Sequence, residues 1–334
     1  MNARRELGVL LAVLAAGLPC SAAAQNLRAE WRFERGNTLT SMGRVHGAVH
    51  AYTQAIQYDP TFTEAYRQRG NVLSGVGQLD GAIADFTQVI RLSPDDADAY
   101  RNRGIAYLRK GDAESAIADL TEVVRLSPQY AEARYDRGTA LAEMGEQDKA
   151  IADFSEAIRL SPAYAEAYYN RSVAYVAKGN FDRAIADLTR TLQLSPHKFA
   201  EADYCLNLVY CQNGDFDRAI AGFSKALRFN PIYSRGYYGR GIAYAGKHEF
   251  NKAIADFTQA LRLNPTCKDP YLERGDAYEQ LGRHDEAITD YTKLIQVYPR
   301  YAEAYYSRSV AYRKKGDLAK AEADLAKAKK LGQQ

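Results

Sequence analysis

Histidines and carboxylates are the residue types that could support acid-base catalysis or bind a metal in this chain of 334 residues. The five histidines are spread along the chain: His46, His50, His197, His248 and His284. No HExxH zinc motif, GxSxG elbow or phosphate-binding glycine loop accompanies them. The carboxylates recur at fixed intervals, as residues on solvated helix faces do. The sequence therefore predicts no enzyme activity, no catalytic residue, no metal site and no cofactor.

The cysteines likewise indicate no specialised chemistry. Cys205 and Cys211 fall on one predicted helix, where six residues of rise separate their Cα atoms by about 9 Å, beyond disulfide reach. Cys267 has no CxxC partner. We therefore expect ordinary thiols and neither a disulfide framework nor a redox site.

The first 24 residues have the three-part layout of a secretory signal. Arg4 and Arg5 precede an apolar stretch over residues 8–18, and three alanines end at Ala24. The stretch is too short for a membrane anchor, because eleven helical residues span only about 16 Å. We predict cleavage after Ala24, no membrane-spanning segment in the mature chain, and a periplasmic location, with secretion as the alternative.

The strongest pattern in the sequence is a period. Prolines recur every 34 or 35 residues, at Pro60, Pro94, Pro128, Pro162, Pro196, Pro231, Pro265 and Pro299. If each proline is position 32 of a repeat, nine repeats cover residues 29–334 after a short lead over residues 25–28. They begin at Ala29, Thr63, Ala97, Ala131, Ala165, Ala200, Ser234, Lys268 and Ala302.

The apolar pattern of each repeat predicts two helices, which we call the A helix and the B helix. In the fifth repeat they are expected over residues 165–178 and 181–194, on either side of a turn at Gly179. Position 20 is alanine in all nine repeats, and position 8 is glycine or serine in most. Small residues at both places predict that the two helices cross closely there, with aromatic side chains at positions 4 and 24 filling the core around them.

A 34-residue unit with an aromatic residue at position 4, a small residue at 8, tyrosine at 11, alanine at 20, an aromatic residue at 24 and proline at 32 resembles the tetratricopeptide repeat (TPR). The resemblance covers residues 29–334. It implies an all-α fold, an alpha-alpha superhelix or TPR solenoid of about nine antiparallel helix pairs. It also implies that A helices line a concave groove that usually holds a peptide or a partner's helix.

One departure from the family concerns position 7, where arginine replaces the usual leucine. A charge beside a helix seam needs a counter-ion, and aspartate stands 16 residues later in seven repeats. The predicted structural ion pairs are Arg69 with Asp85, Arg103 with Asp119, Arg137 with Asp153, Arg171 with Asp187, Arg240 with Asp256, Arg274 with Asp290 and Arg308 with Asp324. The sixth repeat lacks both residues and has Leu206 and Gly222 instead.

The family geometry implies that positions 2, 5, 6, 9, 12 and 13 of the A helices face the groove. The candidate partner-binding residues at positions 5 and 9 are Tyr135, Tyr169, Tyr204, Tyr238, Val173, Leu208, Ile242, Arg67, Asn71 and Arg101. One interpretation is that the tyrosines fill a narrow interior and stack on one another. We favour the other, an exposed aromatic strip that holds an amphipathic helix or an apolar peptide.

The charge balance narrows the class of partner. Lysine and arginine total 44 against 41 acidic residues, a net charge of +3, which gives no electrostatic footprint for nucleic acid or an anionic bilayer. The sequence therefore predicts a protein-protein interaction scaffold whose partner is a protein or peptide and not nucleic acid. The alternative is a self-associating structural module, a homo-oligomer without a dedicated peptide ligand.

Overall fold

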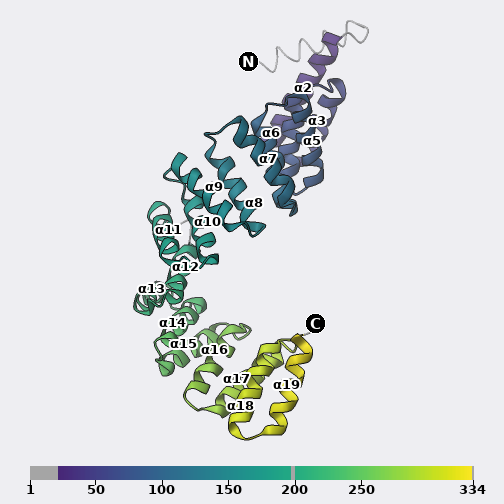
Figure 1. The fold of residues 1–334 in the computed structure, drawn as a ribbon. Helices are drawn as coiled ribbons and strands as arrows, with labels where there is room; N and C mark the ends of the chain where they lie inside the picture. Colours follow the sequence, from purple (N-terminus) through teal and green to yellow (C-terminus); the bar gives the residue numbers. More distant parts are fainter. Residues whose placement is uncertain (1–21, 197–199, 333–334) are drawn as a thin grey trace. The chain divides into compact units, whose positions relative to one another are not determined.

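The computed structural model describes residues 22–196 and 200–332, and every regular element in this part of the chain is a helix (Figure 1). The A helices are α2 (Ala22–Ser41), α4 (Thr63–Gly75), α6 (Ala97–Lys110), α8 (Ala131–Glu143), α10 (Ala165–Ala177), α12 (Ala200–Gln212), α14 (Ser234–Gly246), α16 (Asp269–Gln280) and α18 (Ala302–Lys315). The B helices are α3 (Val45–Tyr58), α5 (Leu79–Leu92), α7 (Ala113–Leu126), α9 (Gln147–Leu160), α11 (Phe181–Leu194), α13 (Phe216–Phe229), α15 (Phe250–Leu263), α17 (His284–Val297) and α19 (Leu318–Gly332). The predicted all-α fold of helix pairs is confirmed.

The first helix begins earlier in the chain than the sequence predicted. Helix α2 begins at Ala22, not at Ala29, and so includes the expected lead over residues 25–28. Alanines are the strongest helix formers, and no proline or glycine interrupts the chain between residues 22 and 29. The predicted signal segment lies, up to residue 21, outside the described residues.

The chain divides into two compact units, which we describe separately. The N-terminal unit ends at Asn170 and the C-terminal unit begins at Arg171. In both units the A helices other than α10 pack on their own B helices, and most contact the next A helix, whereas successive B helices make no comparable contact among the described residues. The A helices of a unit are therefore closer together than its B helices. We call the surface formed by positions 2, 5, 6 and 9 of the A helices the inner face.

The core of a repeat explains the small residues at positions 8 and 20. In the fourth repeat, Ala150 is fully buried where α8 and α9 cross. A Cβ atom on Gly138 would lie only 2.7 Å from the ring of Phe154. The aromatic ring at position 24 thus occupies the space that a side chain at position 8 would need, and close crossing of the pair depends on both residues.

The turn between the two helices of a repeat needs a left-handed residue at position 15. Eight repeats have glycine there, with φ between +70° and +90°: Gly43, Gly77, Gly111, Gly145, Gly179, Gly214, Gly282 and Gly316. The seventh repeat has His248 instead, with φ of +61°. Glycine adopts this conformation without a Cβ clash, whereas histidine does so at a cost.

Replacing His248 with glycine should therefore raise the free energy of unfolding by about 1 kcal/mol. The variant loses an edge-on contact between the His248 and Phe250 rings, whose centroids are 5.7 Å apart. Urea unfolding followed by circular dichroism measures the change. Ala245→Gly, in the same helix α14, is the matched control and should lower stability by about 1 kcal/mol. An unfolding midpoint for His248→Gly at or below that of the wild type would contradict the prediction.

Candidate functional site

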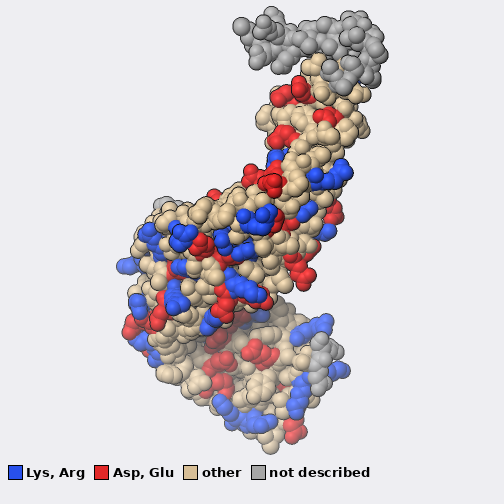
Figure 2. All heavy atoms as spheres, turned by 45° about the horizontal axis from the view of Figure 1, so that its top comes forward, with Lys and Arg blue, Asp and Glu red and all other residues tan. Residues whose placement is uncertain are grey.

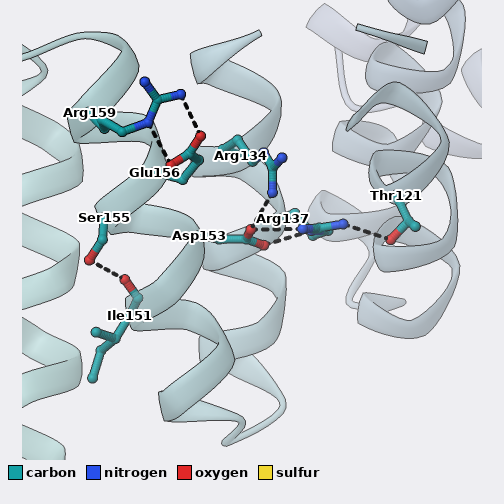
Figure 3. Close-up of polar contacts among 8 residues, drawn as sticks. All are labelled: Thr121, Arg134, Arg137, Ile151, Asp153, Ser155, Glu156 and Arg159. Atoms are coloured by element: carbon teal, nitrogen blue, oxygen red, sulfur yellow. Dashed lines mark hydrogen bonds and ion pairs between the residues drawn. The ribbon is translucent and has the colours of Figure 1, made fainter. Parts of the chain in front are cut away.

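Seven of the eight arginines at position 7 meet an aspartate at position 23 through two parallel hydrogen bonds each. Nε donates to Oδ2 and Nη2 donates to Oδ1, over distances of 2.6–2.9 Å. Figure 3 shows this fork between Arg137 and Asp153. The seven aspartates are only 3–8% exposed. Such bidentate pairs have a fixed geometry and link the A helix to the B helix of one repeat.

The same arginines also contact the preceding repeat, which the sequence analysis did not foresee. Nη1 of Arg137 donates to the hydroxyl of Thr121 on α7 at 3.2 Å (Figure 3). Equivalent bonds of 2.8–3.1 Å join Arg69 to Thr53, Arg103 to Thr87, Arg240 to Ser224, Arg274 to Thr258 and Arg308 to Thr292. Each arginine of this group therefore links three helices. The available signal was serine or threonine at position 25, 16 residues before each arginine.

The sixth repeat replaces this ion pair with a packing contact. Asn207, at position 8, is 3% exposed and donates from Nδ2 to the carbonyl oxygen of Asp203 at 2.8 Å. A Cβ atom on Gly222 would lie 1.9 Å from the Asn207 Oδ1. Glycine at position 23 thus makes room for asparagine at position 8, which reverses the usual order of a small residue at 8 and a larger one at 23.

Both predicted partner-binding arginines already pair with carboxylates on the inner face of the N-terminal unit. Arg67 forms ion pairs with Glu64 on its own helix and with Asp96, and the hydrogen bond with Asp96 is the main cause of its raised pKa. Arg101 donates from Nε to Asp136 at 2.7 Å. A partner could use either guanidinium only by displacing a carboxylate that is already in place.

Amides continue this polar network between successive A helices of the N-terminal unit. The Nδ2 of Asn102 donates to the Oδ1 of Asn71 at 3.3 Å, and Asn71 is exposed. The Nδ2 of Asn170 donates to the hydroxyl of Tyr135 at 3.0 Å. These bonds show that positions 5, 6 and 9 of neighbouring A helices meet on one surface.

The tyrosines at position 5 pack into their own repeats. In the N-terminal unit, Tyr135 is half-buried, with its ring centroid 5.0 Å from that of Tyr164 and 5.9 Å from that of Phe154. Tyr169 is also half-buried. Burial raises the pKa of Tyr135. Its ring partners are residues at positions 24 and 34 of the same repeat, so Tyr135 does not stack on another position-5 tyrosine.

In the C-terminal unit the expectation of an exposed ring is wrong for Tyr204, which is only 8% exposed. Its ring centroid lies 5.8 Å from that of Phe223, and the guanidinium of Arg235 lies over the ring, 4.2 Å from the centroid. Tyr238 is half-buried and packs 6.0 Å from Phe257. Position 5 is close enough to the fully buried ring at position 24 for a large side chain to join the core.

Aliphatic side chains and one tyrosine remain accessible on the inner face of the C-terminal unit. Val173 is 52% exposed, and Leu208 and Ile242 are half-buried. Tyr306, at position 5 of the last repeat, is 55% exposed, and Val310 lies one turn further along α18. The surface available to a partner is therefore more aliphatic than the predicted tyrosine strip.

Carboxylates accompany these apolar residues in the eighth and ninth repeats. Burial, together with the charges of Asp276, Asp269 and Glu303, raises the pKa of Glu273 to about 7. The hydroxyl of Tyr291 donates to Asp276 at 2.6 Å. In Figure 2 basic and acidic side chains are both spread over the visible surface.

Other kinds of site have little support in the described part of the chain. There, no group of three or more histidine, cysteine, aspartate or glutamate residues is placed to hold a metal ion. No helix among the described residues has both the length and the apolarity needed to cross a bilayer. Cys211 and Cys267 are free thiols, and burial raises the pKa of Cys211 to about 11.

Solved structures with similar folds are repeat proteins. A tetratricopeptide repeat protein from Parabacteroides merdae is 19% identical, with a TM-score of 0.57 over 78% of this chain and 98% of that one. The C-terminal part of a TPR repeat-containing protein from Cytophaga hutchinsonii is 18% identical, with a TM-score of 0.59 over 71% of this chain and 97% of that one. Both similarities concern the fold alone.

Sequence models of the repeat match most of the array. Those described as tetratricopeptide repeat match residues 67–131, 165–198, 234–267 and 272–334, and one described as TPR repeat matches residues 36–75 and 138–179. No curated protein is similar enough to count as a relative. The helix pairs, the position-specific core and these matches together show that the chain belongs to the tetratricopeptide repeat family.

Proposed function

We propose that the chain is a protein-interaction scaffold of the cell envelope that binds a segment of a partner protein on the inner face of its A helices. The observation that carries the proposal is the set of apolar side chains left accessible on the inner face of the C-terminal unit. Val173 and Tyr306 are both more than half exposed there. Accessible apolar side chains that share one surface are a feature of binding sites.

The energetics of this surface suit a modest, reversible contact. Burying a large apolar side chain such as Tyr306 stabilises a complex by about 1.5–3 kcal/mol. The A helices are held in place by the arginine-aspartate forks, so little ordering accompanies binding. A partner segment that covers Tyr306, Val310 and Ile242 together would therefore bind without a change in the fold of the scaffold.

The envelope location is part of the proposal and depends on the first 24 residues, with secretion as the alternative. Arg4 and Arg5, the apolar stretch and the alanines before Gln25 support export. Because TPR arrays are generally scaffolds without chemistry of their own, the proposal includes no catalytic step. Recovery of the chain from the cytoplasm with residues 1–24 intact would refute export, and the proposed scaffold role would be unaffected.

The test is a variant that removes the accessible side chains without disturbing the core. Tyr306→Ala with Val310→Ser should reduce cross-linked capture of partner proteins from the envelope fraction at least tenfold, while thermal unfolding stays unchanged. Leu318→Ser is the matched control, because Leu318 is 61% exposed but lies on the B helix α19. Equal capture by the double variant and the wild type would refute the inner-face site. Capture consisting of the chain itself would support self-association instead.

A further inference from the structure

The inner face formed by α14, α16 and α18 carries apolar side chains that are accessible to a partner. Ile242 on α14, Leu272 on α16 and Val310 on α18 are partly exposed, and Tyr306 is more exposed than any of them. These side chains occupy positions 5 and 9, where neighbouring A helices of the N-terminal unit are joined by polar bonds. An occupant of this face must therefore bring apolar surface with it.

The charges on this face determine the chemistry of that occupant. Asp269, Glu273 and Asp276 lie at positions 2, 6 and 9 of α16, and Glu303 lies at position 2 of α18. Among residues 22–196 and 200–332, none of the four forms an ion pair with a lysine, arginine or histidine. The nearby Lys268 lies instead over the ring of Tyr301, 5.1 Å from its centroid.

Hydroxyl groups partly satisfy these carboxylates but do not neutralise them. The Tyr291 hydroxyl donates to Asp276 at 2.6 Å, and the Tyr301 hydroxyl donates to Glu303. Glu273 is half-buried and has no such donor within the described part of the chain, and burial and its acidic neighbours raise its pKa to about 7. A half-buried carboxylate surrounded by like charges is stabilised by any cation placed beside it.

At three other places along the A helices, an arginine of the chain itself pairs with a carboxylate. In the N-terminal unit, Arg67 pairs with Asp96 and Arg101 pairs with Asp136. Earlier in the C-terminal unit, Arg235 pairs with Glu201 at 2.8 Å. In the eighth and ninth repeats, position 5 holds Leu272 and Tyr306, so neither repeat has the arginine that the second and third repeats place there.

We propose that the inner face of α14, α16 and α18 binds a basic, amphipathic segment of a partner protein, whose apolar side chains cover Tyr306 and Val310 and whose lysines or arginines pair with Glu273 and Asp276. This inference rests on the proposed function and specifies the partner of the same surface. Apolar contact supplies most of the affinity, and charge complementarity selects a basic partner over an acidic one.

A pair of designed peptides tests the proposal on the full chain. The probe is a fluorescein-labelled 14-residue amphipathic helix of leucine and lysine, and its counterpart has glutamine in place of every lysine. Fluorescence anisotropy should show binding of the leucine-lysine peptide at least tenfold tighter than that of its counterpart. Binding should weaken from pH 8 to pH 5.5, because Glu273 gains a proton as the pH falls through its pKa of about 7.

Variants assign this binding to the proposed face. Glu273→Gln with Asp276→Asn should weaken binding of the leucine-lysine peptide at least tenfold, and both replacements keep the side-chain shape. The matched control, Asp285→Asn with Glu322→Gln, removes two charges from the B helices α17 and α19 of the same repeats and should leave binding unchanged.

Two results would overturn the inference. One is equal affinity of the wild type and the Glu273→Gln, Asp276→Asn variant for the leucine-lysine peptide, and the other is equal affinity of the wild type for both peptides. If that variant still captures partners from the envelope fraction while Tyr306→Ala with Val310→Ser does not, the inner-face scaffold stands and only the basic partner is refuted.

Discussion

Replacing Asp153 with alanine should lower the free energy of unfolding by about 3 kcal/mol. The substitution leaves the guanidinium of Arg137, whose side chain is 17% exposed, in the seam between α8 and α9 without its carboxylate. Arg134, 3.4 Å from the same carboxylate, loses a second contact. Urea unfolding measures the change, and hydrogen exchange should show that protection is lost first in α8 and α9.

Two controls separate a buried charge from a general effect of mutation. The double variant Arg137→Leu with Asp153→Leu removes both charges and should recover most of the lost stability, because apolar residues often replace a buried ion pair at little cost. Asp80→Ala breaks the exposed pair with Lys110 and should have no measurable effect. Similar losses for Asp80→Ala and Asp153→Ala would contradict a structural role for the forks.

Replacing Gly222 with alanine should lower the free energy of unfolding by about 2 kcal/mol, because the added methyl group overlaps the buried amide of Asn207. Alanine is the better helix former, so helix propensity alone predicts the opposite sign. In an Asn207→Ala background the amide is gone, and Gly222→Ala should then be neutral or stabilising. Strictly additive effects of the two substitutions, measured by urea unfolding, would show that the two sites do not interact.

The sequence was sufficient to predict the fold because the same local choices recur in most of the nine repeats. A single glycine such as Gly138 says little, but small residues at position 8, alanine at 20 and an aromatic residue at 24 recur in register and specify one helix crossing. The position of the arginine-aspartate forks followed from the same recurrence. Deviations such as His248 and Asn207 occur once each, so no pattern reveals how the neighbouring residues adapt to them.

The candidate site was less predictable, because a repeat position gives the face of a helix but not how deeply its side chain is buried. Tyr204 and Tyr306 occupy the same position 5, yet Tyr204 is 8% exposed and Tyr306 is 55% exposed. Tyr204 has the Phe223 ring and the Arg235 guanidinium to pack against. Similarly, the sequence placed Arg67 on the inner face but could not show that its guanidinium forms an ion pair with Asp96.

The most direct test of the inner-face site is photo-cross-linking from single positions. A photoreactive amino acid at Val310, on the inner face of α18, and one at Lys327, exposed on the B helix α19, sample the two sides of the same repeat. If the account is correct, partner proteins are cross-linked from position 310 and not from position 327. Cross-links from position 327 with none from position 310 would contradict it.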